Sequence, residues 1–571
     1  MESFGESFPY RSLVTGSSLM RVVSVEPGSI DEPVQCKLQY VNLDERPEYE
    51  ALSYVWGDPN VTVPITLDGI RFPVTTNLHL ALRYLRREDT RRTLWVDAIC
   101  INQTDIAERN EQVMRMRDIY KYATKVVIWV GEDCTNPPFG GSMAAEQIFT
   151  QLDRVARRER DDAEEEAVDP GGWAFRVARR ERDDAEEEAV DPVEWTFSIL
   201  GFVCLPWFKR IWIIQESAVN LKAHIACGRA SLPWLVFLHG LMRSLPAMRL
   251  TWMAIDWLEY FLSNVVTLQT CLHLYHNWKD EILAANQIAA RIARLLFELG
   301  GNFQCTDPRD RLFAILGLVP GAFDALAATG LSVEYRRSAA DIFRDLAVFL
   351  ITQRRSLDIL AAYGVDWIES TTGSFTGKPS WVPTWDKHPH CTLTPILLSR
   401  MDEDAYGDAP LAEFRFSEDK RTLFIRGVVL GEIALLGDEI TWESLHGSQD
   451  PAPEGSRFLA GLFRRWEHKI LGSPLLEQRY RAPDEALAAW KHCLFHPEDD
   501  LRVTQHFCYD VLLGHVNMSD IAEGQRDAVR SEIDAFTRFT PWSLENKHPF
   551  VVSSGDIGIA ERVVAERTLS G

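Results

Sequence analysis

Three apolar runs, each ending abruptly in polar residues or glycine, lie between Tyr49 and Asp133. They span residues 50–56, 93–97 and 126–130, and amphipathic segments separate them. Apolar runs of this length that alternate with helical patterns are typical of buried parallel strands. The pattern predicts an α/β fold with a doubly wound parallel sheet at the N-terminus.

Two helices are predicted between these strands. The first begins at Asn77, whose short polar side chain suits a helix N-cap. The second follows Asp105, which together with Glu108 resembles a capping box. Apolar residues continue each helix at helical spacing. They are Leu78, Ala81, Leu82 and Leu85 in the first, and Val113, Met116, Ile119, Tyr120 and Ala123 in the second.

The segments beside this unit are predicted to add strands. Residues 1–48 are expected to be a short lead-in with edge strands at 20–25 and 34–41. Residues 63–74 are expected to form a hairpin folded about Asp68-Gly69, because Asp-Gly suits the left-handed positions of a tight turn.

Polar residues follow all three apolar runs. They include Trp56-Gly57-Asp58, the segment from Asp97 to Gln103, and Gly131-Glu132-Asp133. In open α/β sheets the ligand crevice lies beyond the carboxyl ends of the strands. The sequence therefore places a candidate ligand site at that edge of the sheet.

Later segments have different patterns. The stretch Arg154 to Pro170 recurs letter for letter at Arg176 to Pro192, and both copies are too charged to build a core. We interpret residues 154–192 as a duplicated surface insertion within a domain at 49–230. Residues 231–360 are predicted to be mainly helical, and residues 361–571 to be mixed α+β.

Composition excludes several classes of partner. A net charge of −23 argues against nucleic acid or an anionic membrane surface as the main partner. The ten cysteines include no Cys-x-x-Cys pair and the N-terminus lacks a signal-peptide pattern, so a cytoplasmic protein is expected. The most apolar long stretch, residues 250–276, carries Asp256 and Glu259, which favours a buried helix over a membrane span.

No motif indicates a resident metal or cofactor. Phosphate-binding, dinucleotide-binding, zincin and α/β-hydrolase signatures are all missing from the sequence. Four residues near the C-terminus could supply metal ligands: Cys493, His496, His506 and Cys508. Structural zinc sites usually have tighter paired spacing than these four residues. We expect no metal and no permanently bound cofactor.

Several of these motifs together resemble the fungal heterokaryon incompatibility (HET) domain. The matching segments are 49–57, 94–103 with Glu111-Gln112-Val113, 119–120, 126–131 and 210–216, in the order typical of the family. Residues 305–318 resemble a segment commonly found downstream. The resemblance implies a cytoplasmic effector of allorecognition that promotes programmed cell death, with self-association of HET domains and an unknown incompatibility partner protein.

HET domains in turn resemble Toll/interleukin receptor (TIR) domains, whose flavodoxin-like sheets can cleave NAD. This resemblance implies NAD as a substrate and Glu216 as the catalytic residue, because Glu216 stands four residues after Trp212 as in plant TIR domains. It also implies a mobile loop at 98–104 after Asp97. The candidate NAD-binding residues are Trp56, Gly57, Asp97, Asn102, Gln103 and Trp212, where the Trp rings stack on nicotinamide and the amides bond to its carboxamide.

Each of these residues also has a structural interpretation. Glu216 can instead cap a helix or pair with Arg210, and Asp97 can instead shape a loop or cap a helix. Trp56, Trp95 and Trp129 are more typical of a core than of a ligand platform. Gly57 and Gly131 can simply give the backbone freedom at strand ends, and Asp307 to Asp310 reads as a turn with salt bridges. At the level of function, the alternative to an NAD hydrolase is a non-catalytic signalling or adaptor module.

Overall fold

The structure is a computed structural model of the 571-residue chain. It describes residues 8–13, 16–132, 142–157, 191–249, 255–299, 303–362, 378–383, 385, 412–426, 433–436, 463–480, 482–494, 509–511, 513, 516–517, 526, 547–552 and 557–561. The chain divides into two compact units. The first comprises residues 1–349 and 385–388, and the second comprises residues 350–384 and 389–571.

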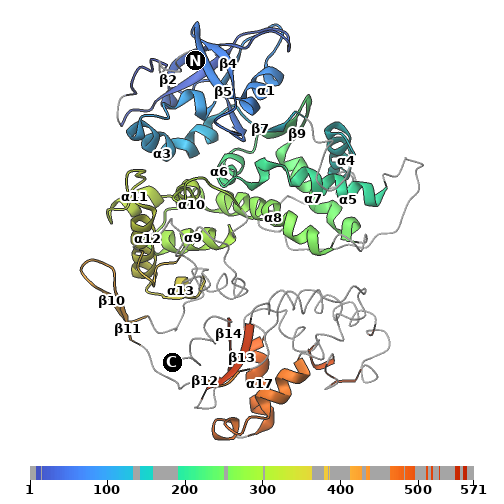
Figure 1. Cartoon of the computed structure of the whole chain (residues 1–571), viewed down its shortest axis with the longest axis vertical. Helices are drawn as coiled ribbons and strands as arrows, with labels where there is room; N and C mark the ends of the chain where they lie inside the picture. The colour runs from blue at the N-terminus through green and yellow to red at the C-terminus, as the bar shows by residue number, and fades with distance from the viewer. Residues whose placement is uncertain are drawn as a thin grey trace. The chain divides into compact units, whose positions relative to one another are not determined.

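The first unit contains one mixed β-sheet (Figure 1). Within the described residues it has nine strands in the order β5-β4-β2-β1-β6-β3-β7-β8-β9. The strands are β1 (Leu19–Val25), β2 (Gln35–Asn42), β3 (Glu50–Tyr54), β4 (Thr62–Leu67), β5 (Ile70–Thr75), β6 (Arg92–Trp95), β7 (Lys125–Gly131), β8 (Ala223–Cys227) and β9 (Ala230–Pro233). The predicted α/β class is confirmed. Its longest parallel part is β6-β3-β7-β8, which has the antiparallel neighbours β1 and β9 on its two sides. β2 and β4 also pair in parallel.

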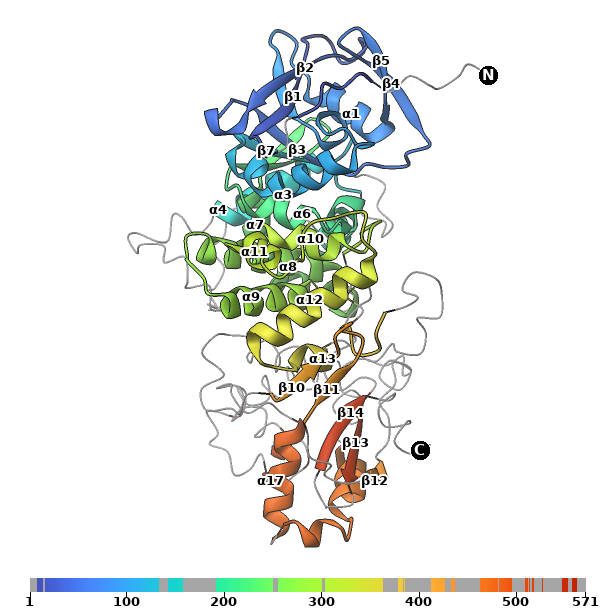
Figure 2. The ribbon, with the colours of Figure 1, turned by 90° about the vertical axis from the view of Figure 1, so that its left-hand side faces the viewer.

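Helices cover both faces of the parallel part (Figure 2). Helix α1 (Thr76–Leu85) contacts the ring of Trp129 through Tyr84. Helix α6 (Ile213–Ala218) contacts Ser53 through Glu216. Ser53 lies beside Ile128 in the register of β3 and β7, so Ser53 and Trp129 point to opposite faces of the sheet. Helix α3 (Ile106–Tyr122) shares the α6 face, where its Tyr120 packs against Trp95.

The two N-terminal strands were predicted as edge strands, and that prediction was wrong. β1 lies between β2 and β6, and β2 lies between β1 and β4; the edges are β5 and β9. Nearly every residue of β1 is buried, including Arg21 and Ser24. A strand that is buried on both faces and paired on both sides is part of the interior. The N-terminal segment therefore contributes β1 to the core of the sheet.

The local predictions for the turn and the helix starts have mixed outcomes. β4 and β5 form the expected hairpin, with φ of 49° at Asp68 and 81° at Gly69. Asp105 caps α3 by accepting from two backbone N–H groups, as predicted. The predicted capping box is incomplete, because the Glu108 carboxylate binds Arg21 and the Asn102 N–H instead of the Asp105 N–H. Asn77 does not cap α1, because the N-cap is Thr75 and Asn77 lies inside the helix. Its side chain instead donates to the carbonyl of Val55 and accepts from the indole of Trp129. The buried apolar faces of both helices are as predicted.

The remainder of the first unit is mainly helical, as expected. Its helices are η1 (Leu43–Glu45), α2 (Asp97–Cys100), α4 (Ala145–Arg157), α5 (Pro192–Val203), η2 (Pro206–Lys209), α7 (Trp234–Arg249), α8 (Ile255–Trp278), α9 (Ala285–Glu298), α10 (Asp310–Leu316), α11 (Ala322–Ala327) and α12 (Ala339–Arg354), which continues into the second unit. An aromatic cluster joins α4, α5, η2 and α7. Most of the duplicated insertion lies outside the described residues, in the stretch of chain between α4 and α5.

The second unit contains short strands and helices, which confirms its mixed character. They are α13 (Asp358–Ala362), β10 (Phe414–Phe416), β11 (Leu423–Ile425), β12 (Ile433–Leu436), η3 (Leu476–Gln478), α17 (Pro483–Leu494), β13 (Lys547–Val552) and β14 (Ile557–Glu561). Trp466, Trp490 and Tyr509 form a buried aromatic centre. Among the helices of both units that the structure describes, none has the length and apolar character needed to cross a bilayer.

Candidate functional site at the carboxyl edge of the sheet

Glu216 is buried against the carboxyl half of β3. Its side chain accepts a hydrogen bond from the hydroxyl of Ser53, which in turn accepts one from the indole of Trp207 at 2.8 Å. Arg210 lies on the other side, with its Nη1 atom 3.6 Å from Glu216 Oε2. The same guanidinium donates to the carbonyl of Tyr54. The last motif of the family pattern is therefore docked on the first core strand in spite of the insertion before it.

The surroundings of Glu216 change its protonation. Burial raises the pKa of Glu216 to about 7, although the Arg210 charge and the Ser53 hydrogen bond act in the opposite direction and limit the rise. Nearby Asp97 adds a smaller upward contribution to this pKa. The carboxyl group therefore exists in both protonation states near neutral pH. This property is common in acid–base groups of active sites, and it is also found in buried structural pairs.

Asp97 and Trp56 form the outer part of the same group. Asp97 accepts from the indole Nε1 of Trp56 at 2.7 Å and from the backbone N–H of Ala98 at 2.7 Å. Burial raises the pKa of Asp97, and Arg210 opposes that rise. The exposed fraction increases from 1% for Glu216 through 19% for the Arg210 side chain to 38% for Trp56. We call Trp56, Asp97, Arg210 and Glu216 the edge cluster; it opens to solvent at Trp56.

Residues after the sheet hold α6 in place. The backbone N–H of Ile211 donates to the carbonyl of Gln304 at 3.1 Å, and Arg210 and Gln304 form a parallel bridge. Asp310 accepts from the hydroxyl of Tyr335 at 2.5 Å and lies within hydrogen-bonding reach of Trp212. Burial raises the pKa of Asp310 to about 6. Trp212 thus contacts α10, and residues 305–318 support the motif that carries Glu216.

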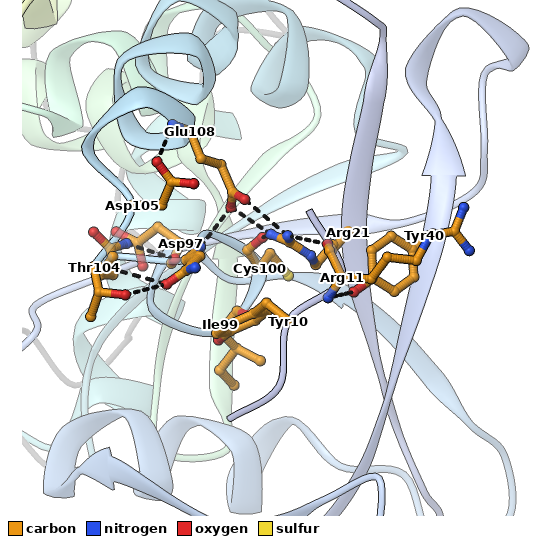
Figure 3. A network of polar contacts seen from close by, with 12 residues as sticks. Tyr10, Arg11, Arg21, Tyr40, Asp97, Ile99, Cys100, Thr104, Asp105 and Glu108 are labelled. Carbon is orange, nitrogen blue, oxygen red and sulfur yellow. Dashed lines mark hydrogen bonds and ion pairs between the residues drawn. The ribbon is translucent and has the colours of Figure 1, made fainter. Parts of the chain in front are cut away.

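The segment after β6 is ordered by several anchors (Figure 3). Residues 97–100 form the short helix α2, and Ile99, Cys100 and Ile101 are buried. Arg21 of β1 donates to the carbonyl of Cys100 at 3.0 Å and forms a salt bridge with Glu108, whose carboxylate also accepts from the backbone N–H of Asn102. The resemblance to TIR domains implied a mobile loop here, whereas the structure shows a packed segment.

Two predicted binding residues lie in this segment and are engaged locally. The side-chain oxygen of Asn102 accepts a hydrogen bond from the hydroxyl of Thr104, two residues later, at 2.8 Å. The side-chain amide of Gln103 donates to the carbonyl of Asp97 at 3.0 Å. The structure therefore places Gln103 beside the edge cluster, and gives Asn102 a local structural contact.

The alternatives for the Trp and Gly residues are resolved in part. Trp95 and Trp129 are fully buried core residues, as interpreted, whereas the same interpretation was wrong for Trp56, which is exposed. Gly57 has φ of 79°, which agrees with a backbone role. Asp307 pairs with Arg309 at 2.6 Å, which confirms the turn with a salt bridge.

Sequence reasoning missed Ser53 and Trp207, which fix the Glu216 carboxylate. A signal for Ser53 was present, since a hydroxyl in an otherwise apolar buried strand must find a hydrogen-bond partner. Arg210 was recognised only as a partner for Glu216, and the 3.6 Å approach of the two side chains agrees with that pairing. The contact between Trp212 and Asp310 joins residues far apart in the chain and has no local signal.

Comparisons with known proteins show which family this part of the chain resembles. The model of the family described as "Heterokaryon incompatibility protein (HET)" matches residues 49–216, the span that runs from β3 to Glu216. Residues 49–216 are a HET domain. The chain is also 28% identical over 530 residues to "Heterokaryon incompatibility protein 6, OR allele" from Neurospora crassa, covering 84% of this chain and 73% of that protein. No solved structure matches.

The HET domain is smaller than the sheet to which it belongs. β1 and β2 precede the matched span, and β8 and β9 follow it. The edge cluster lies wholly inside the HET domain, whereas Arg21 and Asp310, which support it, lie outside. Within the described residues, no group of three or more His, Cys, Asp or Glu side chains is arranged to hold a metal ion, and His496, His506 and Cys508 lie outside them.

Proposed function

We propose that this chain is an effector of heterokaryon incompatibility that promotes cell death, and that its HET domain hydrolyses NAD at the edge cluster. The HET match and the similarity to the Neurospora crassa protein support the first part. One observation carries the second part. A buried carboxyl group whose pKa is near neutral, Glu216, lies beside Arg210 at the carboxyl edge of a parallel sheet. Ligands of open α/β sheets bind at this edge.

The reaction needs little from the protein beyond charge and position. The bond between ribose C1′ and the nicotinamide nitrogen breaks, and its electron pair leaves with the nitrogen, which becomes neutral. Water then bonds to C1′ and loses a proton, giving ADP-ribose and nicotinamide. Positive charge develops on the ribose, and the carboxylates of Glu216 and Asp97 stabilise it. Ionised Glu216 accepts the proton of the water, and Trp56 offers an exposed ring on which nicotinamide stacks.

Substrate must reach a carboxyl group that is 1% exposed. In this proposal, self-association of HET domains reorders residues 98–104 and opens the cluster from the Trp56 side. Arg210, which holds the Tyr54 carbonyl and faces Glu216, is the side chain that has to move.

The second candidate function is a non-catalytic adaptor that acts through protein–protein contacts. The observation in its favour is that Glu216 is fully enclosed and bonded to Ser53, which fits a residue that anchors α6 to β3. In that case the loops of the HET domain recruit a partner and no substrate enters the sheet edge.

Turnover of NAD by the full-length chain separates the two functions. The purified protein at high concentration is incubated with NAD, and nicotinamide release is measured by chromatography. We expect Glu216→Gln to lower the rate by about 100-fold or more, the usual effect of losing a group that stabilises transition-state charge. The matched control is Glu146→Gln on the exposed surface of α4, which should leave the rate unchanged.

Overproduction of the same variants in a fungal host gives a second readout. If the chain is an NAD hydrolase, Glu216→Gln should abolish growth arrest while circular dichroism and self-association match the parent protein. If no variant turns over NAD and folded Glu216→Gln still arrests growth, the enzyme proposal fails and the adaptor is correct.

A further inference from the structure

A cavity lies on the opposite face of the sheet from Glu216. It has a volume of about 370 Å³ and lies beside the C-terminal turn of α1, over the strands β7, β8 and β9. Lys125 and Val127 line it and alternate along β7 in phase with Trp129, on the face that α1 covers. This volume falls within the range of sites for small molecules.

Small residues leave the floor of this cavity open. α1 covers Trp129, but beyond it the sheet presents Ala226, Ala230 and Ser231 to the cavity. Gly228 closes the turn between β8 and β9 with φ of 57°, and a Cβ atom there would lie 2.6 Å from the carbonyl oxygen of Glu132. The turn is therefore held close to the end of β7, and it places Arg229 at the rim.

Positive charge is concentrated around this space. Five of the lining residues are Arg or Lys and one is Glu, in a chain whose net charge is −23. Those side chains are Arg83, Arg86, Arg92, Lys125 and Arg229, with Glu88 as the acid. A local excess of cations on an acidic protein is the pattern expected of a site for a small anion, because the rest of the surface repels a polyanion as large as nucleic acid.

Two of these cations are free to meet a ligand. Arg92 pairs with Glu50 at 2.7 Å, and Arg86 donates to backbone carbonyls of residues 29–33. Among the described residues, the side chains of Lys125 and Arg229 form no hydrogen bond and no salt bridge. Burial lowers the pKa of Lys125, and nearby Arg92 lowers it further against the opposing charge of Glu50. His224 lines the same cavity, where burial and the Lys125 charge lower its pKa.

We propose that this cavity is a binding site for a small anion with two or more phosphate groups. Lys125 and Arg229 contact the phosphates, since an ammonium group and a planar guanidinium both bind phosphate oxygens through charge-assisted hydrogen bonds. Arg83 and Arg86 add positive potential from α1. The site is separate from the edge cluster and does not depend on NAD hydrolysis.

Isothermal titration of the full-length chain with tripolyphosphate at low salt tests this site. We expect Lys125→Gln and Arg229→Gln each to weaken binding by about tenfold, as the loss of one charge-assisted contact usually does. The matched control is Lys222→Gln, an exposed lysine just before β8 that does not line the cavity, and its affinity should stay within about twofold of the parent value. Glu216→Gln should bind tripolyphosphate as the parent protein does.

Three results would overturn the proposal. The first is no binding of tripolyphosphate by the parent protein at millimolar concentration. The second is an equal loss of affinity in Lys222→Gln and Lys125→Gln, which would indicate general electrostatic attraction. The third is orthophosphate binding as tightly as tripolyphosphate. Arg229 is exposed, so the Arg229→Gln result is informative even if Lys125→Gln folds poorly.

Discussion

At the scale of single residues, polar side chains inside apolar strands hold the site together. Arg21 interrupts the apolar run of β1 and Ser53 interrupts that of β3, and both are completely buried. Arg21 reaches Glu108 and the carbonyl of Cys100, while Ser53 reaches Glu216. The sequence shows that such residues need partners, but it does not show which residues those are, because the partners lie 79 or more positions away.

Removing Arg21 should destabilise the first unit. In Arg21→Met the Glu108 carboxylate stays buried without its counter-charge, which costs about 3–5 kcal/mol for pairs of this kind. The measurement is the free energy of unfolding by urea, followed by Trp fluorescence. Arg91→Met is the control, because its ion pair with Glu26 is at the surface, where solvent screens it, and its loss should change the free energy of unfolding far less. Equal effects of the two changes would contradict this account.

At the scale of elements, the periodicity of the sequence predicted the positions of strands and helices well. It predicted which elements pair or pack with one another less well. The three core strands, the Asp68-Gly69 hairpin and the apolar face of α3 were all correct. The interior position of β1 was missed because pairing partners are not encoded in the period of a single strand. The cap at Asn77 failed because a tertiary contact, with the carbonyl of Val55, takes up that side chain.

The packed state of residues 97–104 leads to a prediction at this scale. The hydroxyl of Tyr10 donates to the carbonyl of Ile99 at 2.9 Å and ties the N-terminal segment to α2. Tyr10→Phe removes about 1 kcal/mol of local stabilisation, so amide hydrogen exchange across residues 97–104 should become about fivefold faster. Mass spectrometry of the corresponding peptides measures the rate. Tyr84→Phe, whose hydroxyl bonds to Glu132, is the control, and exchange across residues 97–104 should not change in it.

At the scale of the whole molecule, buried acids make stability depend on pH. Burial raises the pKa of Glu216 to about 7 and that of Asp310 to about 6, from ordinary values of 4.5 and 3.8. A raised pKa means that the folded state binds the proton more tightly than the unfolded state does. The contribution is complete below the ordinary pKa and is lost as pH rises through the folded value.

Glu216→Gln isolates this effect from the rest of a chain with many acids. The variant should gain melting temperature relative to the parent protein at about pH 8 and lose that advantage at about pH 5, where the parent carboxyl group is protonated. The difference corresponds to at most about 3 kcal/mol for a shift of this size. Scanning calorimetry of both proteins across this range is the measurement. A difference in melting temperature that does not vary with pH would show that the Glu216 carboxyl group does not titrate in this range.

The interior position of β1 also has a consequence for folding during synthesis on the ribosome. During synthesis β1 can pair early with β2, which follows it after a short connection, but its other edge is complemented by β6, at residues 92–95. Until that stretch has been synthesised, the nascent hairpin carries an unpaired apolar edge, the kind of surface that chaperones recognise. Because the chain is made from its N-terminus, the sheet cannot be completed around β1 until its central strand, β6, has been synthesised.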